Sequence, residues 1–104
     1  MQPVKTDSTF RMEELSANTK RKYAIIASIA KHNTPTLTDI SSQTGIPASS
    51  LKRQISQLRT DYSMDIRFVS ERNNKGRTGH YHIYDWGVLD RSEFLVRYGS
   101  ILEK

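Results

Sequence analysis

The 104-residue sequence has no cysteine, and no apolar run comes near the roughly 20 residues that a helix needs to cross a bilayer. Without cysteine, disulfides and thiolate zinc sites are excluded, so packing alone must stabilise the fold. The first residues, Met1 to Lys5, are polar and lack the apolar segment of a secretory signal. We therefore expect a cytoplasmic protein without a membrane-spanning segment.

Sequence motifs of catalysis are missing as well. There is no cysteine nucleophile, no H-E-x-x-H pair of zinc ligands, no glycine-rich phosphate loop and no serine in a nucleophile-elbow context. His80 and His82 lie two residues apart and would share one face of a strand, but no third ligand stands at a telling spacing. We expect no enzymatic activity, no metal or other cofactor, and no small-molecule ligand.

The residues that are present indicate one folded domain. A chain of this length suits a single core, and 36% hydrophobic with 26% charged residues is ordinary for a globular domain. Sixteen Lys and Arg against eleven Asp and Glu give a formal charge of +5. A positive charge favours polyanionic partners, but its distribution along the chain must decide which partner it serves.

The first third of the chain predicts a flexible arm over residues 1–15 and then a helix over about 19–32. Asn18 is the expected N-cap of this helix. Apolar residues recur in the helix at helical spacing, namely Ile25, Ile26, Ile29 and Ala30. Its first turn holds three cations, Lys20, Arg21 and Lys22, although the helix dipole makes that end positive. Such a cluster is usually a solvated face, and a phosphate contact would also explain it.

Two further helices are predicted on either side of a tight turn. The second covers residues 37–44 and should end at Gly45, because glycine adopts the left-handed conformation easily. Pro47 makes the turn, and a third helix follows over about 48–62. One face of the third helix is apolar: Leu51, Ile55, Leu58 and Tyr62. The opposite side is polar and has no carboxylate before Asp61: Ser49, Arg53, Ser56, Gln57 and Thr60, flanked by Ser50 and Lys52.

The remaining sequence predicts a hairpin and a last helix. Alternation with a period of two begins at Ile66 and returns around Tyr81, so two strands are expected, joined by a basic loop over residues 72–79. We expect Tyr84 and Trp86 to pack where the hairpin meets the last helix. That helix should start near 91, with Asp90 as N-cap and Glu93 as capping-box partner. Its apolar stripe comprises Phe94, Leu95, Tyr98, Ile101 and Leu102.

The stretch 37–58 (LTDISSQTGIPASSLKRQISQL) resembles the helix-turn-helix of bacterial winged-helix transcriptional regulators. The matching positions are the turn residues Gly45 and Ile46 and the core positions Leu51, Ile55 and Leu58. Two positions depart from the family pattern: Ser41 replaces a small apolar residue, and Gln54 stands where a third core residue is often found. The resemblance, extended over residues 19–86, implies an α+β fold with a three-helix core and a two-stranded hairpin wing, to which the helix expected near 91 is added as an extra C-terminal helix.

The resemblance also implies a function, namely sequence-specific binding of double-stranded DNA by a transcriptional regulator. The third helix would lie in the major groove, where Arg53 pairs with guanine and Gln57 with adenine. Ser49, Ser50 and Lys52 would hold phosphates, with Ser56 on the same face. The wing would contact the backbone or the minor groove through Arg72, Lys75 and Arg77.

Two questions stay open at the level of sequence. Winged-helix domains also serve as protein-interaction modules, which would need apolar anchors on the third helix where this chain has polar side chains. The domain is expected over residues 16–87, and the helical segment 88–104 either closes its core or pairs with a second copy in a homodimer.

Overall fold

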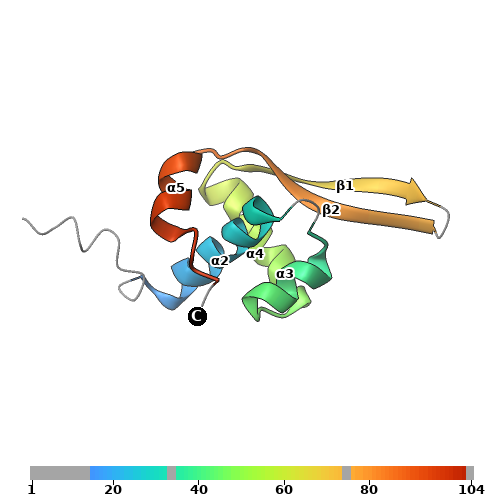
Figure 1. Cartoon of the computed structure of the whole chain (residues 1–104), viewed down its shortest axis with the longest axis horizontal. Coiled ribbons are helices and arrows are strands. Elements are labelled where there is room, and N and C mark those ends of the chain that lie inside the picture. The colour runs from blue at the N-terminus through green and yellow to red at the C-terminus, as the bar shows by residue number, and fades with distance from the viewer. Residues whose placement is uncertain (1–14, 33–34, 74–75, 103–104) are drawn as a thin grey trace, which may run out of the picture.

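The computed structural model describes residues 15–32, 35–73 and 76–102. Over these residues the fold is α+β, with four helices and a two-stranded antiparallel sheet (Figure 1). The elements are α2 (Ala17–Lys31), α3 (Leu37–Thr44), α4 (Ala48–Asp61), β1 (Asp65–Asn73), β2 (Gly76–Asp85) and α5 (Arg91–Tyr98). Residues 1–14, which make up nearly all of the expected N-terminal arm, lie outside the described residues.

One hydrophobic core joins all of these elements. It is built from apolar side chains of α2, α3, α4, both strands and α5, and the prediction of a single core is confirmed. Its buried members are Ile25, Ile26, Ala27, Ile29, Ile40, Ile46, Leu51, Ile55, Leu58, Met64, Ile66, Tyr81 and Phe94. The helical spacing that predicted α2 and α4 therefore identified the faces that the fold buries.

The helix ends follow from side-chain caps. Helix α2 begins earlier than expected, because Ser16 rather than Asn18 is the N-cap and its hydroxyl accepts a hydrogen bond from the Thr19 amide at 3.1 Å. Helix α3 has the predicted bounds. It starts with a capping box between Thr36 and Asp39 and ends at Gly45, whose φ of 76° is left-handed as predicted.

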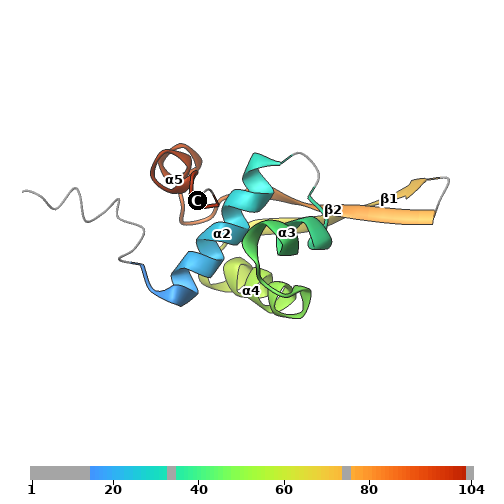
Figure 2. The ribbon, with the colours of Figure 1, turned by 60° about the horizontal axis from the view of Figure 1, so that its bottom comes forward.

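The β1–β2 hairpin projects beyond the helices (Figures 1 and 2). Its pairing runs from Asp65 opposite Asp85 to Asn73 opposite Gly76, with a register shift next to Asp65. The sequence-based expectation of a loop over 72–79 was wrong for most of that range, because β1 and β2 continue through it and only 74–75 lie between them. The polar and glycine residues of this range, which had predicted a loop, pair across the two strands through their backbones.

The face of the hairpin that points toward the helices becomes more exposed with distance from the core. Ile66 and Tyr81 point into the core as the alternation predicted. Phe68, on the same face farther out, is 51% exposed and packs edge-on against Tyr81, with ring centroids 5.1 Å apart. Gly79 leaves room for that ring, because a Cβ there would overlap the Phe68 side chain. Among the side chains that the structure describes, this aromatic pair therefore packs against the glycine where the hairpin leaves the core.

Helix α5 packs against α2 through aromatic side chains. Tyr23 of α2 meets Phe94 and Tyr98, with ring centroids 5.3 and 4.8 Å apart, and Trp86 meets Phe94 at 5.6 Å. The expectation for Trp86 is confirmed. The one for Tyr84 was wrong, because its ring is 53% exposed and stacks under Arg67 at 4.7 Å.

The start of α5 follows its predicted cap in part. The carboxylate of Asp90 accepts from the Glu93 amide at 2.9 Å, as expected for an N-cap. Glu93 itself accepts from Arg97, one turn onward, at 3.0 Å instead of returning to the cap.

None of the described helices combines the length and the apolar composition that crossing a membrane requires.

Candidate nucleic-acid interface

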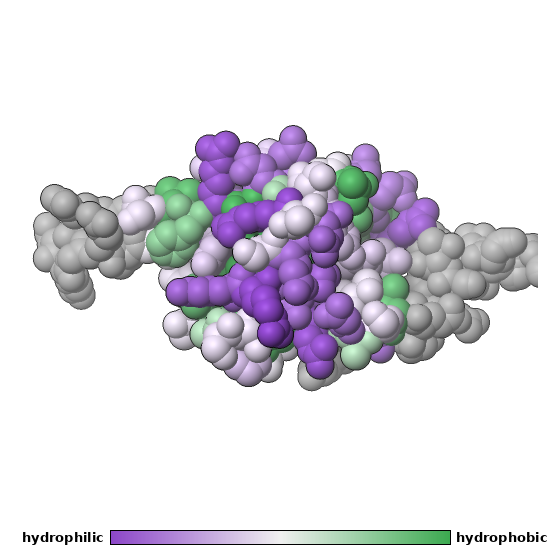
Figure 3. Space-filling view, turned by 180° about the vertical axis from the view of Figure 1, so that it is seen from behind, coloured by the Kyte–Doolittle hydropathy of each residue, from purple (hydrophilic) through white to green (hydrophobic). Residues whose placement is uncertain are grey.

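Helix α4 divides sharply into a buried and an exposed side. Leu51, Ile55 and Leu58 are at most 1% exposed, whereas the predicted outward residues are open to solvent except for Gln57, which is half-buried. The exposed polar side chains on that side are Ser49, Lys52, Arg53, Ser56 and Thr60. Seen from the back of Figure 1, where α4 lies, the middle of the surface is mostly hydrophilic (Figure 3). The face therefore offers hydrogen-bond donors and positive charge.

The turn between α3 and α4 fixes how α4 is presented. After Gly45, the Ile46 side chain is buried and its carbonyl accepts a hydrogen bond from the Ser41 hydroxyl at 2.7 Å. The amide of Ile46 donates to the Thr44 hydroxyl at 3.2 Å. Ser41, one of the two departures from the family pattern, thus satisfies the backbone of the turn. The polar side chain replaces apolar packing with a hydrogen bond at the same place.

The second departure, Gln54, belongs to a buried polar cluster that joins α2 to α4. Lys22 and Gln54 are each 5% exposed, and the Lys22 ammonium donates to Gln54 Oε1 at 3.0 Å and to Gln57 Oε1 at 2.9 Å. The sequence-based reading of Lys22 as part of a solvated face was wrong. Two amide oxygens supply the partners that a buried ammonium requires, since leaving it unpaired would cost several kcal/mol.

This cluster fixes the orientation of two glutamine amides. An ammonium only donates, so each amide must turn its oxygen toward Lys22 and its NH₂ group away from it. Gln57, which is half-buried at the edge of the outward face, therefore presents donors there. A bidentate pair with adenine would need the same oxygen to face outward. The hydrogen bond from Lys22 therefore competes with the expected adenine contact of Gln57 for the amide oxygen, and that contact stays a prediction.

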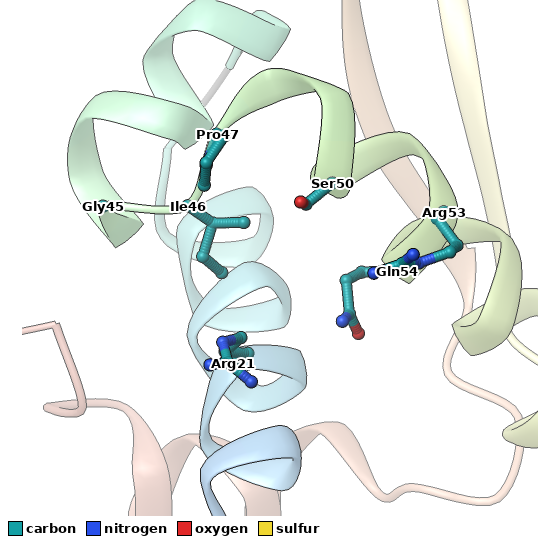
Figure 4. Close-up of a pocket in the computed structure, with 7 residues that line it drawn as sticks. All are labelled: Arg21, Gly45, Ile46, Pro47, Ser50, Arg53 and Gln54. Carbon is teal, nitrogen blue, oxygen red and sulfur yellow. The ribbon is translucent and has the colours of Figure 1, made fainter.

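A cavity of about 440 Å³ opens beside this cluster, between α2 and α4 (Figure 4). Ser50, Arg53 and Gln54 project from α4 toward the side of α2, and Arg21 of α2 lies across the gap. The turn completes the lining with Gly45, Ile46 and Pro47. None of the described lining residues is acidic. Arg21, Lys22 and Gln54 are functional candidates that the sequence-based list of site residues did not include.

The hairpin contributes less to the described site. Lys75 lies outside the described residues, and for Arg72 and Arg77 only the backbone is described, where the two residues are paired partners. The described cation on the hairpin's outer face, Arg67, forms a salt bridge with Asp65 at 2.9 Å. The hydrogen bond from Arg67 lowers the pKa of the Asp65 carboxyl and, reciprocally, raises the pKa of Arg67. The charge of Arg67 is therefore largely balanced by Asp65.

The two histidines of β2 share a strand face as expected. His82 is exposed and its ring packs edge-on against Tyr84, with centroids 4.7 Å apart. Within the described part of the chain, no group of three or more His, Cys, Asp or Glu side chains gathers where a metal ion could bind.

Comparison with known proteins gives a fold and no function. No protein-family model matches the chain, and no curated protein does. Among solved structures, the chain is similar to the crystal structure of a DUF2131 family protein from Shewanella amazonensis SB2B. The TM-score is 0.64 at 19% sequence identity, and the match covers 85% of this chain and 91% of that one. At this identity the likeness shows a shared fold alone.

Proposed function

We propose that this protein is a winged helix-turn-helix DNA-binding protein that regulates transcription by occupying a DNA site. In this proposal α3 and α4 form the helix-turn-helix, α4 enters the major groove, and the β1–β2 hairpin is the wing. The role is binding rather than catalysis.

One observation carries the proposal. Helix α4 follows a tight turn and packs its apolar face into the core. Its other face exposes serine, lysine, arginine and threonine side chains and no carboxylate before Asp61 at the end of the helix. A major groove about 12 Å wide accepts one helix, and such side chains suit base edges and phosphates. The formal charge of +5 supports the same partner through long-range attraction.

The geometry refines which bases the helix would read. Arg53 is exposed and can place two donors on the O6 and N7 atoms of guanine. Gln57, whose oxygen already accepts from Lys22, would act mainly as a donor, so it favours acceptors such as guanine O6 and N7 or thymine O4. Ser49, Ser50 and Lys52 would hold phosphates, and Ser56 would lie close to the groove floor.

A protein-interaction module is the alternative reading of the fold. It would need apolar or aromatic anchors on the outward face of α4. In α4 as described, every exposed residue after Ala48 is polar or charged. The composition of this face therefore favours nucleic acid.

We keep the homodimer as a separate proposal. The apolar stripe of α5 is already used within the chain, since Phe94 is in the core and Leu95, Tyr98, Ile101 and Leu102 pack against it. The apolar side chains left exposed nearby are Val88 and Val96, at 69% and 81%. A two-fold dimer through this end would let two copies of α4 reach half-sites about 34 Å apart.

The test is a fluorescence-anisotropy titration against a pool of duplex DNA at two salt concentrations. Wild type, an Arg53→Ala/Gln57→Ala double variant and an Arg91→Ala control, which removes one charge from α5, are compared. We expect salt-sensitive binding by the wild type and the control, and loss of sequence discrimination in the double variant. No binding by the wild type at low salt would overturn the proposal.

A further inference from the structure

The described lining of the cavity between α2 and α4 contains hydrogen-bond donors and no negatively charged side chain. Arg21 and Arg53 bring two guanidinium groups to it, and Ser50 adds a hydroxyl. Lys22 lies immediately behind Gln54, so three cations gather within two helical segments. Among the described residues, no carboxylate lines the cavity or bonds to any of the three. This local excess of positive charge attracts anions.

Gln54 adds a more specific observation. Gln54 is only 5% exposed, and its side-chain oxygen accepts a hydrogen bond from Lys22. Its NH₂ group therefore points away from Lys22, on a side chain that lines the cavity, and no described residue accepts a hydrogen bond from it. A buried donor without an acceptor destabilises the fold, so such groups in native proteins usually serve a ligand or water.

The chemistry of the lining selects the ligand. The guanidinium fork of Arg21, an amide NH₂ and a hydroxyl together can donate to several oxygens of one group. A phosphate carries both the negative charge and enough acceptor oxygens to meet them, and arginine is suited to phosphate by its planar fork. Two of the lining residues, Arg21 and Arg53, are exposed, so the cavity is in contact with solvent and a phosphate could enter without rearrangement of the helices.

We propose that the cavity binds a phosphate group through Arg21, Ser50 and Gln54, while Arg53 at its rim adds positive charge and keeps its fork for the groove. Resting on the proposed function, that phosphate belongs to the DNA backbone next to the groove that α4 occupies. Arg21 then clamps the strand from α2, while Lys22 holds Gln54 so that its NH₂ group meets the phosphate. A free phosphate or a phosphorylated small molecule has the same chemistry and is separated by the test.

The variant is Arg21→Gln, because Arg21 is exposed and lies off the α4 face, so neither the core nor the proposed base contacts change. Arg91→Gln, an exposed arginine of α5 with the same charge loss, is the matched control. In one arm, anisotropy titrations with duplex DNA are repeated over a range of salt. In the second arm, inorganic phosphate and pyrophosphate are titrated without DNA, and the Gln54 side-chain amide is followed by ¹H–¹⁵N NMR.

A backbone phosphate predicts that Arg21→Gln weakens DNA binding several-fold for every sequence, and that the slope of log K against log[salt] falls by about 0.9, which is one phosphate contact. Arg91→Gln should leave the slope unchanged. A free ligand predicts saturable shifts of the Gln54 amide with phosphate, abolished in Arg21→Gln, with an unaltered DNA slope. If neither the slope nor the amide responds, the cavity is not a phosphate site. If the wild type binds no DNA, the proposed function fails, and the phosphate arm still decides the cavity.

Discussion

The ammonium of Lys22 lies 2.9 Å from the Gln57 side-chain oxygen, although the two residues are 35 apart in sequence. Through this contact the first turns of α2 set which end of the Gln57 amide reaches the surface of α4. A side chain that belongs to the buried interior thereby controls the hydrogen-bonding character of one on the outward face.

This relationship predicts that Lys22→Met changes sequence preference. Methionine keeps the apolar stem of lysine but frees the Gln57 oxygen, so the amide can turn and form the bidentate pair with adenine. We expect the preference at that base pair to move from guanine or thymine toward adenine, by about 1–3 kcal/mol. The measurement is selection of bound sequences from a randomised duplex pool. Lys20→Met, the same change two residues earlier on α2, should select the wild-type sequences, and identical selections by all three proteins would contradict the role of Lys22.

The two left-handed glycines should differ in how much an alanine costs. Gly45 has a φ of 76° with no atom near a built Cβ, so Gly45→Ala should lower the free energy of unfolding by about 1–2 kcal/mol. Gly87 has a φ of 62°, and its Cβ would overlap the carbonyl of Tyr62, whose oxygen also accepts from the Val88 amide. Gly87→Ala should therefore cost at least about 1 kcal/mol more, through steric overlap added to backbone strain. Urea denaturation measures both, and equal losses would rule out the close approach at Gly87.

Much of the fold was predictable because its signals are local. Gly45 ended α3 where the sequence indicated, since only the residue's own φ matters there. The period of two predicted the inward positions Ile66 and Tyr81. The hairpin loop was overestimated because glycine and asparagine in residues 72–79 have the same local preferences whether or not an opposite strand pairs with them. The N-cap at Ser16 was missed because Asn18 is an equally good capping residue on local grounds.

The candidate site was predictable only on its outward side. Solvent exposure of Ser49, Lys52 and Arg53 follows from their position on the helix. The burial of Lys22 depends on contacts with residues 32 and 35 positions away, and nothing local distinguishes it from Lys20 and Arg21. The one available signal was Gln54, a polar residue on the buried side of α4, because a buried amide must find a partner. It predicted that a partner exists but not which one.

Helix α5 should unfold together with the rest of the domain. Phe94 is 4% exposed and contacts aromatic rings of α2 and of the segment after β2, so Phe94→Ala should cost about 3–5 kcal/mol. Val96→Ala, at a position 81% exposed, should change the free energy of unfolding by less than about 0.5 kcal/mol. Urea denaturation followed by both fluorescence and circular dichroism should give one shared transition. Two separate transitions would mean that residues 88–104 form an independent unit.

Stability should decline at alkaline pH through Tyr23. Burial raises the pKa of its hydroxyl above the ordinary 10.0, and the neighbouring Tyr62 and Tyr98 raise it further. Because the folded state favours the protonated form, this contribution is fully present below pH 10 and is lost as the pH rises through the raised value. We expect the melting temperature of the wild type to fall more steeply than that of Tyr23→Phe as the pH rises above about 10, the ordinary value of the hydroxyl. Parallel curves for the two proteins would contradict the assignment.

The proposed insertion of α4 into the major groove can be followed residue by residue in a ¹H–¹⁵N NMR titration of the full chain with a selected duplex. We expect the largest amide shifts on residues 49–57 of α4 and on the hairpin, while α5 stays unchanged. Shifts confined to α5, or none at low salt, would contradict it.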